Sequence, residues 1–322
     1  MAIIPNSKSI KNAPKAPETV IEQVSLGDLT WINIEKPTDT EISHLAANYS
    51  FHPLDLDDVL SKRQRPKIDE YKDYLFFVFH FPVYNKTERL LMPSQVSVFV
   101  GANYIITLHA GNLKPLSKLF RECEIDVESR NEYLSHGPGY LLYRIVDRLV
   151  DYCQPIVSKI LDNMDTIEDE IFARRRTGTV RDISVLRRDI ITFRRTIWPM
   201  RTVATSLEPK LRRYTDHDMG VYFGDLIDHV DKIWDSLDEC KEVIEGLSAT
   251  YDSMSYNNYN SGIRTLTIFA TITLPALIVA SVYGMNIPLP FQDTEHSFII
   301  VAGITLGLSM LTALILRRLK II

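Results

Sequence analysis

The sequence predicts an α+β protein with a cytosolic α/β domain, long helices and a C-terminal two-helix transmembrane hairpin. Runs rich in β-branched and aromatic residues lie between Trp31 and about Leu108, which indicates strands in that part of the chain. The chain then changes to helical periodicity, and it ends in two long apolar runs. If these runs span a membrane, they determine on which side of it the rest of the protein lies.

The two apolar runs are Thr265–Tyr283 and Phe298–Leu316, and neither contains a charged residue. A helix needs roughly 20 apolar residues to cross the hydrocarbon core of a bilayer, and both runs approach that length. Buried helices of a large soluble core are the alternative, but such helices rarely stay uncharged for so long. Pro275 lies inside the first run, and membrane helices tolerate proline. The runs therefore predict two membrane spans.

The short link between the runs predicts a hairpin whose outer ends lie on the same side of the membrane. Arg317, Arg318 and Lys320 follow the second run, and the positive-inside rule places that end in the cytoplasm. The N-terminal residues lack the apolar stretch of a secretory signal, so we expect them to be cytoplasmic too. We therefore expect a multi-pass protein of the cell membrane (inner or plasma membrane) with both termini cytoplasmic. The expected boundaries are 263–283 for the first span, 284–297 for an external loop, 298–316 for the second span and 317–322 for a basic tail.

Charge and motif content exclude several classes of protein. Lys and Arg number 36 and Asp and Glu number 41, a formal net charge of −5, so binding to nucleic acid is not expected. The cysteines Cys123, Cys153 and Cys240 form no CxxC pair, which disfavours a disulfide scaffold and zinc or iron–sulfur sites. No GxxxxGK[ST] loop, HExxH motif or dinucleotide loop occurs in the sequence. Neither ATP-driven pumping nor an enzyme is therefore expected.

The part before the spans has two compositions. Residues 1–28 are rich in Lys, Pro and Asn and are expected to be a flexible N-terminus, whereas residues 29–137 are expected to form the cytosolic α/β domain. The expected strands are 31–34, 74–84, 95–100 and 103–109, and the expected helices are 40–49, 53–60 and 114–128. No regular βαβ repeat is evident, so we expect a small mixed domain.

A cytosolic helical region is expected over residues 138–262. The pattern over Tyr140–Phe172 ends acidic and the pattern over Ile183–Leu207 is basic, so we expect an antiparallel pair with complementary charge. A long stalk helix is expected over about residues 221–283, because no proline occurs between Pro209 and Pro275. Its apolar residues alternate at spacings of three and four, as in a heptad seam: Phe223, Leu226, Val230, Ile233, Leu237, Cys240, Ile244, Leu247, Tyr251 and Met254. This seam packs either on copies of itself or on the two preceding helices.

The first span carries polar residues at helical spacing. Roughly along one face lie Asn260, Ile263, Thr267, Thr271, Leu274 and Ser281. Polar groups facing lipid are unfavourable, so we expect this face to point inward. Two helices cannot enclose a water-filled path, so transport would need several copies around one axis. The face contains no carboxylate and neither span has a His or Cys cluster, so it suits a hydrated ion better than a bare or soft metal.

The first span ends in Tyr283, Gly284, Met285 and Asn286, followed by a short loop and the second span. This arrangement resembles the CorA family of magnesium channels, whose signature is Gly-Met-Asn at this place. Further matches to the family are WINI at 31–34, HPL at 52–54, QRPK at 64–67 and TIWPMR at 196–201. The resemblance covers nearly the whole chain. The loop departs from it, because it reads IPLPFQDTEHS where the family commonly has Met-Pro-Glu-Leu.

The resemblance implies a funnel-shaped homopentamer whose long helix lines the pore. The residues implied at the outer pore mouth are Tyr283, Gly284, Met285 and Asn286, and those implied along the pore and gate are Asn260, Ile263, Leu266, Thr267 and Leu274. Asn286 would offer its amide oxygen to the water shell of the ion. Ile263, Leu266 and Leu274 would form an apolar constriction that closes by dewetting.

The resemblance also implies Mg²⁺ sites between the cytosolic domains of neighbouring subunits. The matching residues are Asp58 with Asp225, and Asp57 with Asp147 as a second pair. Carboxylate oxygens suit Mg²⁺, directly or through retained waters. Bound Mg²⁺ would bridge facing carboxylates and favour the closed state, whereas bare carboxylates repel one another. The alternative for each aspartate is a helix N-cap or a solvated surface group.

Together these expectations describe passive, potential-driven uptake of hydrated Mg²⁺, with Co²⁺ or Ni²⁺ as further cargo and Mg²⁺ as regulator. A doubly charged cation gains about 4.6 kcal/mol per 100 mV when drawn to a negative interior. One alternative is a transporter of Zn²⁺ or another divalent ion within the same superfamily. Another is a membrane-anchored scaffold or sensor whose hairpin only tethers it. The expected partners are further copies of the chain, the lipid bilayer and divalent cations.

Overall fold

The computed structural model describes residues 21–61, 64–173, 179–215, 218–285, 288–290 and 296–319. The chain divides into two compact units, which we call unit 1 (Met1–Glu245) and unit 2 (Gly246–Ile322). The boundary falls inside the longest helix, so each unit contains part of that helix.

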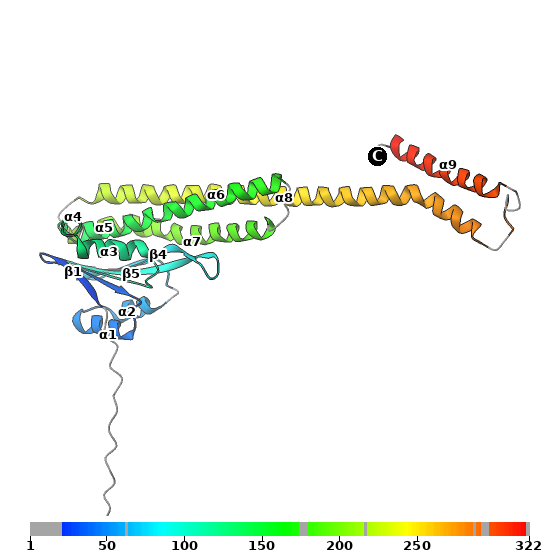
Figure 1. Ribbon diagram of the computed structural model, residues 1–322. Coiled ribbons are helices and arrows are strands. Elements are labelled where there is room, and N and C mark those ends of the chain that lie inside the picture. Colours follow the sequence, from blue (N-terminus) through cyan, green and yellow to red (C-terminus); the bar gives the residue numbers. More distant parts are fainter. Residues whose placement is uncertain are drawn as a thin grey trace, which may run out of the picture. The chain divides into compact units, whose positions relative to one another are not determined.

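Unit 1 consists of a mixed sheet and the helices around it (Figure 1). The strands are β1 (Glu22–Leu26), β2 (Leu29–Glu35), β3 (Lys67–Glu70), β4 (Tyr74–Asn85), β5 (Leu90–Gly101) and β6 (Tyr104–His109). The helices are α1 (Asp39–Asn48), α2 (Pro53–Leu60), α3 (Lys114–Ile125), α4 (Val127–Leu134), α5 (Gly137–Asp151), α6 (Cys153–Phe172), α7 (Thr179–Leu211), the 3₁₀ turn η1 (Arg212–Tyr214) and the first part of α8 (Gly220–Tyr283). The strands predicted at 31–34, 74–84, 95–100 and 103–109 are confirmed as parts of β2, β4, β5 and β6.

The strand order in the sheet is β1-β2-β6-β5-β4-β3. β2 and β6 run parallel, and the other neighbouring strands run antiparallel. Only two residues connect β1 to β2, and Gly27 there adopts a φ of +57°, which glycine reaches without a steric penalty. The expectation of a flexible N-terminus over residues 1–28 is therefore wrong for residues 22–26. Their own strand signal is weak, but pairing with β2 satisfies the backbone groups that face β2, and Val24 is buried.

Helices cover both faces of the sheet (Figure 1). α1 and α2 lie on one face, where Phe51 stacks on Phe99 with ring centroids 4.1 Å apart. α3, α5 and α7 lie on the other face, where Phe120 of α3 meets Trp31 edge-on at 5.0 Å. Trp31 also donates its indole N–H to the Thr107 hydroxyl at 3.1 Å, which satisfies the polar atom of a fully buried ring. Both faces of the sheet are thus closed by apolar contacts.

Two predicted helices are each divided in the structure. The single helix expected over 114–128 is wrong, because Asp126 ends α3 and its carboxylate accepts the backbone N–H groups of Glu128 and Ser129 at the start of α4. The single helix expected over 140–172 is also wrong, because α5 ends and α6 begins around Tyr152. Pro155 in the first turn of α6 has no N–H to donate, which favours a new helix start at this point.

The basic face of α7 is neutralised by α8 rather than by α6. Arg194 contacts Asp238 at 2.5 Å, and its guanidinium lies 4.7 Å from the centre of the Trp234 ring. Arg201 bonds Asp231 through two nitrogens. α6 and α7 pack against each other as predicted. Among the described residues, however, the arginines with ion-pair partners on a neighbouring helix pair with α8, so their predicted pairing with the acidic end of α6 is wrong.

The heptad seam of α8 is buried inside the single chain in unit 1. Phe223, Leu226, Val230, Ile233, Leu237, Cys240 and Ile244 are each at most 1% exposed. α8 contacts α5 through Tyr143 and Phe223, and it contacts α7 through Trp198 and Trp234, with ring centroids 4.6 Å apart. Of the two packings left open by the sequence, the seam in unit 1 adopts packing on preceding helices. It is not available there for pairing with copies of the same helix.

Unit 2 contains the rest of α8 and the helix α9 (Ser297–Arg318). α8 and α9 are both long and apolar enough to cross a membrane. Pro275 is accommodated inside α8, which runs without a break to Tyr283 as the sequence predicts. The basic residues Arg317 and Arg318 form the last turn of α9.

Candidate functional site

In unit 2, the residues assigned to the pore and gate lie on α8 and are exposed in the single chain. They are Asn260, Ile263, Leu266, Thr267 and Leu274, and the three apolar ones are exposed to 44%, 68% and 53%. Leu266 precedes Thr267 by one residue, so it projects about 100° away from it around the helix. The five residues therefore form a broad face rather than a narrow stripe.

A different face of the same helix segment is partly covered. The partly buried positions recur at spacings of three and four: Ile268, Thr271, Ile272, Pro275, Ala276 and Val279. Thr271 donates its hydroxyl to the Thr267 carbonyl at 2.8 Å, so it is satisfied within the helix. The face with Asn260 and Ile263 is thus the one that the described part of unit 2 leaves more open.

The end of α8 brings part of the predicted pore mouth into one turn. The Gly284 N–H bonds the Ala280 carbonyl at 3.0 Å, and the Met285 N–H bonds the Val282 carbonyl at 3.1 Å. A Cβ at Gly284 would lie 3.1 Å from the Ala280 carbonyl oxygen, which is a tight contact that glycine avoids. The Tyr283 hydroxyl donates to the Pro290 carbonyl at 3.1 Å and so ties the turn to the loop. Asn286 lies outside the described residues.

In unit 1, Asp58 lies near the end of α2 and its carboxylate is already engaged. Oδ2 is 2.6 Å from the Lys67 ammonium, and Oδ1 accepts a hydrogen bond from the Gln64 side chain. Lys67 pairs with Asp69 as well, so one ammonium serves two carboxylates. Burial opposes the charge on Lys67, but the hydrogen bonds to Asp58 and Asp69 outweigh it and raise the pKa of Lys67.

Asp55 completes what we call the α2–β3 acidic group, which consists of Asp55, Asp58 and Asp69. One carboxylate oxygen from each lies within 4.8 Å of those of the other two. Asp55 is 1% exposed, and its oxygens accept hydrogen bonds from the hydroxyls of Tyr74 at 2.8 Å and Tyr71 at 3.1 Å. Burial raises the pKa of Asp55 despite these hydrogen bonds.

The second cluster, which we call the α5–α8 group, consists of Asp147, Asp151 and His229. One ligand atom from each lies within 4.8 Å of the others. Asp225 stands one turn before His229 on α8, with its carboxylate 3.8 Å from the imidazole. Burial and the charge of Asp151 raise the pKa of Asp147, although Arg144 lies 3.7 Å away and opposes this shift. Mutual repulsion makes the ionised pair costly without a cation.

The two groups differ in ligand chemistry. The α2–β3 acidic group offers carboxylate oxygens, which Mg²⁺ prefers and reaches directly or through water. The α5–α8 group adds the imidazole of His229, a ligand that also suits Zn²⁺, Co²⁺ and Ni²⁺. Both sets of residues therefore fit a divalent cation, with a broader choice of metal at the second.

The predicted aspartate pairs join neighbouring subunits, so within one chain their members lie at different places, and the pairing stays a prediction. Asp58 belongs to the α2–β3 acidic group, whereas Asp147 and Asp225 lie at the α5–α8 group. Asp57 is exposed on α2 and belongs to neither group of described residues. The residues that the sequence analysis missed are Asp55, Asp69, Asp151 and His229. The sequence does contain a signal for Asp151 and His229. Asp151 is four residues from Asp147, and His229 is four residues from Asp225, so each pair shares a helix face.

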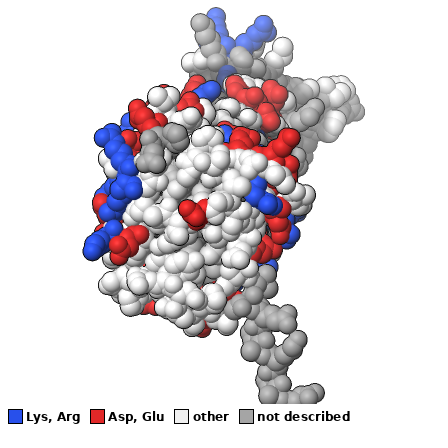
Figure 2. Space-filling model, turned by 90° about the vertical axis from the view of Figure 1, so that its left-hand side faces the viewer, with Lys and Arg blue, Asp and Glu red and all other residues white. Residues whose placement is uncertain are grey.

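Charged side chains of both signs lie around the margins of one view of the molecule, with a broad uncharged area between them (Figure 2). Lys and Arg do not merge into a continuous basic surface on the described part of this face. A continuous basic patch is the usual electrostatic footprint of a nucleic-acid-binding protein. The described part of this face does not show that footprint.

Comparison with known proteins identifies the family. Residues 27–318 match the family described as CorA-like Mg2+ transporter protein, so the chain belongs to this family. A relative in Bacillus subtilis (strain 168), YfjQ, is described as a candidate metal ion transporter. It is 30% identical over 95% of this chain and 93% of its own length. The cobalt/magnesium transport protein CorA of Thermotoga maritima is 31% identical over 80% of this chain and 73% of its own length.

Solved structures show the same fold. The CorA magnesium transporter of Methanocaldococcus jannaschii superposes with a TM-score of 0.77 at 22% identity, covering 95% of this chain and 94% of that chain. The predicted architecture, an N-terminal α/β domain followed by long helices and two C-terminal apolar helices, is thereby confirmed.

Proposed function

We propose that this protein is a homopentameric channel for passive uptake of hydrated Mg²⁺, driven by the membrane potential and closed by intracellular Mg²⁺. The observation that carries the proposal is the exposed face of α8 in unit 2, with Asn260, Ile263 and Thr267, on a helix of membrane-spanning length. Copies arranged around one axis would cover this face and give its polar groups water. Membership of a Mg²⁺ transporter family and the CorA relatives support magnesium as cargo, with Co²⁺ as a second ion.

The path through this channel suits an ion that keeps its water. Mg²⁺ dehydrates reluctantly, and hydroxyls, amides and carbonyls can bond to its water shell without replacing it. In the proposal Asn286 presents its amide oxygen at the outer mouth, and Ile263, Leu266 and Leu274 form the constriction that closes by dewetting. In the proposal the protein lies in the plasma or inner membrane with both termini in the cytoplasm. The negative potential of the cell interior then draws the cation inward.

Closure in this proposal depends on Mg²⁺ at the acidic residues of unit 1. Asp58 and Asp57 of one subunit would face Asp225 and Asp147 of its neighbour, with Mg²⁺ between them. Burial, and after it repulsion from Asp151, raises the pKa of Asp147, which supports a role in cation binding because a bound cation would offset both costs. Asp151 and His229 would add ligands on the same side. Bound metal would favour the closed arrangement as a population shift.

A zinc transporter is the second candidate, and two observations favour it. The zinc transport protein ZntB of Photorhabdus laumondii is 24% identical over 80% of this chain and 76% of its own length. His229 also adds a nitrogen ligand to the α5–α8 group. Ion competition in vesicles separates the two candidates. Zn²⁺ flux that persists in excess Mg²⁺ and depends on a pH gradient would favour the zinc transporter over the magnesium channel.

The test of the proposed function is Mg²⁺ flux into vesicles that contain the purified protein, at an imposed negative internal potential. We expect Asn286→Ala to abolish flux, because it removes the amide at the pore mouth. Asn258→Ala is the matched control, since it removes an amide two residues from Asn260 on another face of α8 and should leave flux intact. Flux in Asn286→Ala equal to that in Asn258→Ala would remove Asn286 from the pore mouth. Absence of flux from the unmodified protein would favour a tethered scaffold or sensor instead.

A further inference from the structure

Lys67 occupies the place of a cation in the α2–β3 acidic group. Its ammonium is 2.6 Å from Asp58 and also pairs with Asp69, and both carboxylates belong to a set whose oxygens lie within 4.8 Å of one another. Three carboxylates and one ammonium leave a formal charge of −3 + 1 = −2 on the group. A metal ion that binds Asp58 and Asp69 together would need the position that this ammonium holds.

The position of Lys67 allows its ammonium to move away from Asp58 and Asp69. Its side chain is 32% exposed, which gives the ammonium a route to water. Lys67 begins β3, the edge strand of the sheet, and the Asp58 carboxylate is 16% exposed. Solvent screens a partly exposed ion pair more than a fully buried one, which weakens the attraction that holds the ammonium in place.

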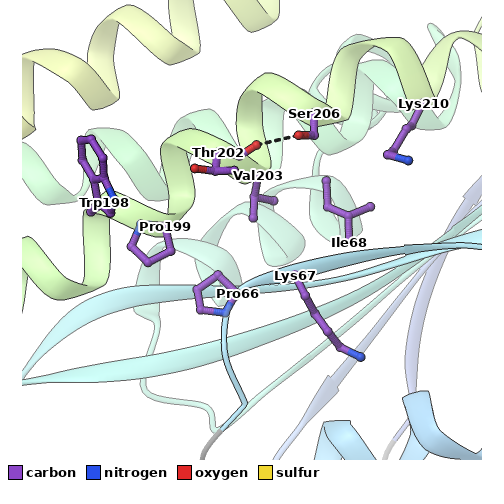
Figure 3. A pocket seen from close by; sticks show the side chains of 9 residues that line it. All are labelled: Pro66, Lys67, Ile68, Trp198, Pro199, Thr202, Val203, Ser206 and Lys210. Atoms are coloured by element: carbon purple, nitrogen blue, oxygen red, sulfur yellow. Dashed lines mark hydrogen bonds between the residues drawn. The ribbon is translucent and has the colours of Figure 1, made fainter.

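Lys67 lies beside a cavity, but its side chain is directed away from the helix that closes it. The cavity has a volume of about 420 Å³ between β3 and α7, and the residues around it include Lys67, Pro66, Trp198 and Lys210 (Figure 3). In Figure 3 the side chain runs from the strand away from the side chains of α7. Substituting this side chain should therefore alter the α2–β3 acidic group and leave the side chains of α7 around the cavity in place.

We propose that Lys67 is a tethered competitor of the divalent cation at Asp58, and that it sets the Mg²⁺ concentration at which the protein responds. This inference rests on the proposed role of Asp58 in Mg²⁺-dependent closure. Two cations on the same carboxylates repel, so ammonium and metal occupy the group in turn. In the metal-free state the lysine neutralises part of the carboxylate charge, and the metal binds only when the lysine is displaced.

The test is a Mg²⁺ titration of the full-length protein in detergent, followed by digestion with chymotrypsin. Chymotrypsin cleaves after aromatic residues, so exchanging a lysine leaves its main sites unchanged. The Mg²⁺-bound, closed form should resist the protease, so the Mg²⁺ concentration that protects half of the protein from cleavage measures Mg²⁺ binding. We expect Lys67→Met to lower this concentration about tenfold, which corresponds to ~1.4 kcal/mol. Methionine keeps an unbranched apolar side chain of similar length but carries no charge. Lys67→Arg keeps the charge and should require at least as much Mg²⁺ as the unmodified protein.

Lys210→Met is the matched control. Lys210 lines the same cavity but pairs with Glu70, so its removal should leave the Mg²⁺ requirement unchanged. An unshifted or raised Mg²⁺ requirement in Lys67→Met would overturn the inference. A lowered thermal midpoint with no shift in Mg²⁺ requirement would mean that Lys67 only ties α2 to β3, and would also overturn it.

Asp58→Asn in the same assay separates this inference from the proposed function. If Asp58→Asn loses protection by Mg²⁺ while Lys67→Met behaves like the unmodified protein, Lys67 is not a competitor but Asp58 still belongs to the Mg²⁺ sensor. Full protection in both Asp58→Asn and Asp225→Asn removes the sensor itself.

Discussion

Three aspartates of unit 1 differ in what surrounds their carboxylates. Asp55 is buried and receives two tyrosine hydroxyls, so its carboxylate is satisfied without a metal. Asp58 is neutralised by Lys67. Asp147 lies beside Asp151, and its pKa is raised by burial and by that neighbouring charge. The ionised form of Asp147 is thus a cost to the metal-free protein, and a bound cation would remove that cost.

This difference predicts how Asp147→Asn changes stability. A carboxyl whose folded pKa is raised contributes stability at low pH, and this contribution is lost as the pH rises through the folded pKa. In chelator at neutral pH we expect Asp147→Asn to have a higher thermal midpoint than the unmodified protein, and this gain should shrink on acidification. Excess Mg²⁺ should reverse the order, because the variant has lost a ligand.

The thermal scan needs a control that alters charge without altering the α5–α8 group. Asp165→Asn serves this purpose, since Asp165 is exposed on α6. It should follow the unmodified protein with and without Mg²⁺. An unmodified protein that is more stable than Asp147→Asn in chelator at neutral pH would contradict the account.

The sequence predicted single residues of the candidate site, but not the residues that contact them. Asp58, Asp147 and Asp225 are clear from the family resemblance, and His229 could be found from its i, i+4 relation to Asp225. The approach of Lys67 to Asp58 could not be found in this way. It depends on β3 lying at the sheet edge beside α2, which is a tertiary property.

At the level of elements, α8 has a different environment in each unit. In unit 1 its seam is buried on α5 and α7, whereas in unit 2 its residues are mostly exposed. Periodicity predicted the length of the helix and its seam correctly, but a seam has the same pattern whatever it packs against. The partner had to come from long-range contacts such as Trp198 with Trp234.

The buried seam predicts a large effect of truncating one of its side chains. Ile233 is 1% exposed, so Ile233→Ala should cost about 2–5 kcal/mol through lost burial and a remaining cavity. Val243 on the same helix is 36% exposed, and Val243→Ala should have a much smaller effect. Thermal unfolding of the metal-free protein measures both. Equal small effects would mean that the seam is not packed within the subunit.

The broad exposed face of α8 in unit 2 predicts the effect of a charge in the constriction. Leu266→Asp should hydrate this part of the path and raise the Mg²⁺ leak in vesicles, because dewetting requires apolar walls. Leu306→Asp places the same charge on α9, where Leu306 is 71% exposed, and should not raise the leak. A reduced leak in Leu266→Asp would indicate that Leu266 does not face the axis, as its angular separation from Thr267 allows.

For the whole molecule, the sequence was sufficient for the class because its two strongest signals are local. The apolar runs and the strand-rich segment each need only neighbouring residues to be recognised. The breaks at Asp126 and Tyr152 and the strand at Glu22–Leu26 depend on caps and pairing that composition does not reveal. Subunit number and closure involve several chains, and they remain proposals.

The most direct test of the central claim is Mg²⁺ influx into vesicles at a fixed negative internal potential, measured with and without Mg²⁺ on the side of unit 1. The account predicts rapid influx when that side is free of Mg²⁺ and strong suppression when it holds millimolar Mg²⁺. Asp225→Asn should resist this suppression while conducting normally. Influx that is indifferent to Mg²⁺ on that side in the unmodified protein would contradict the account.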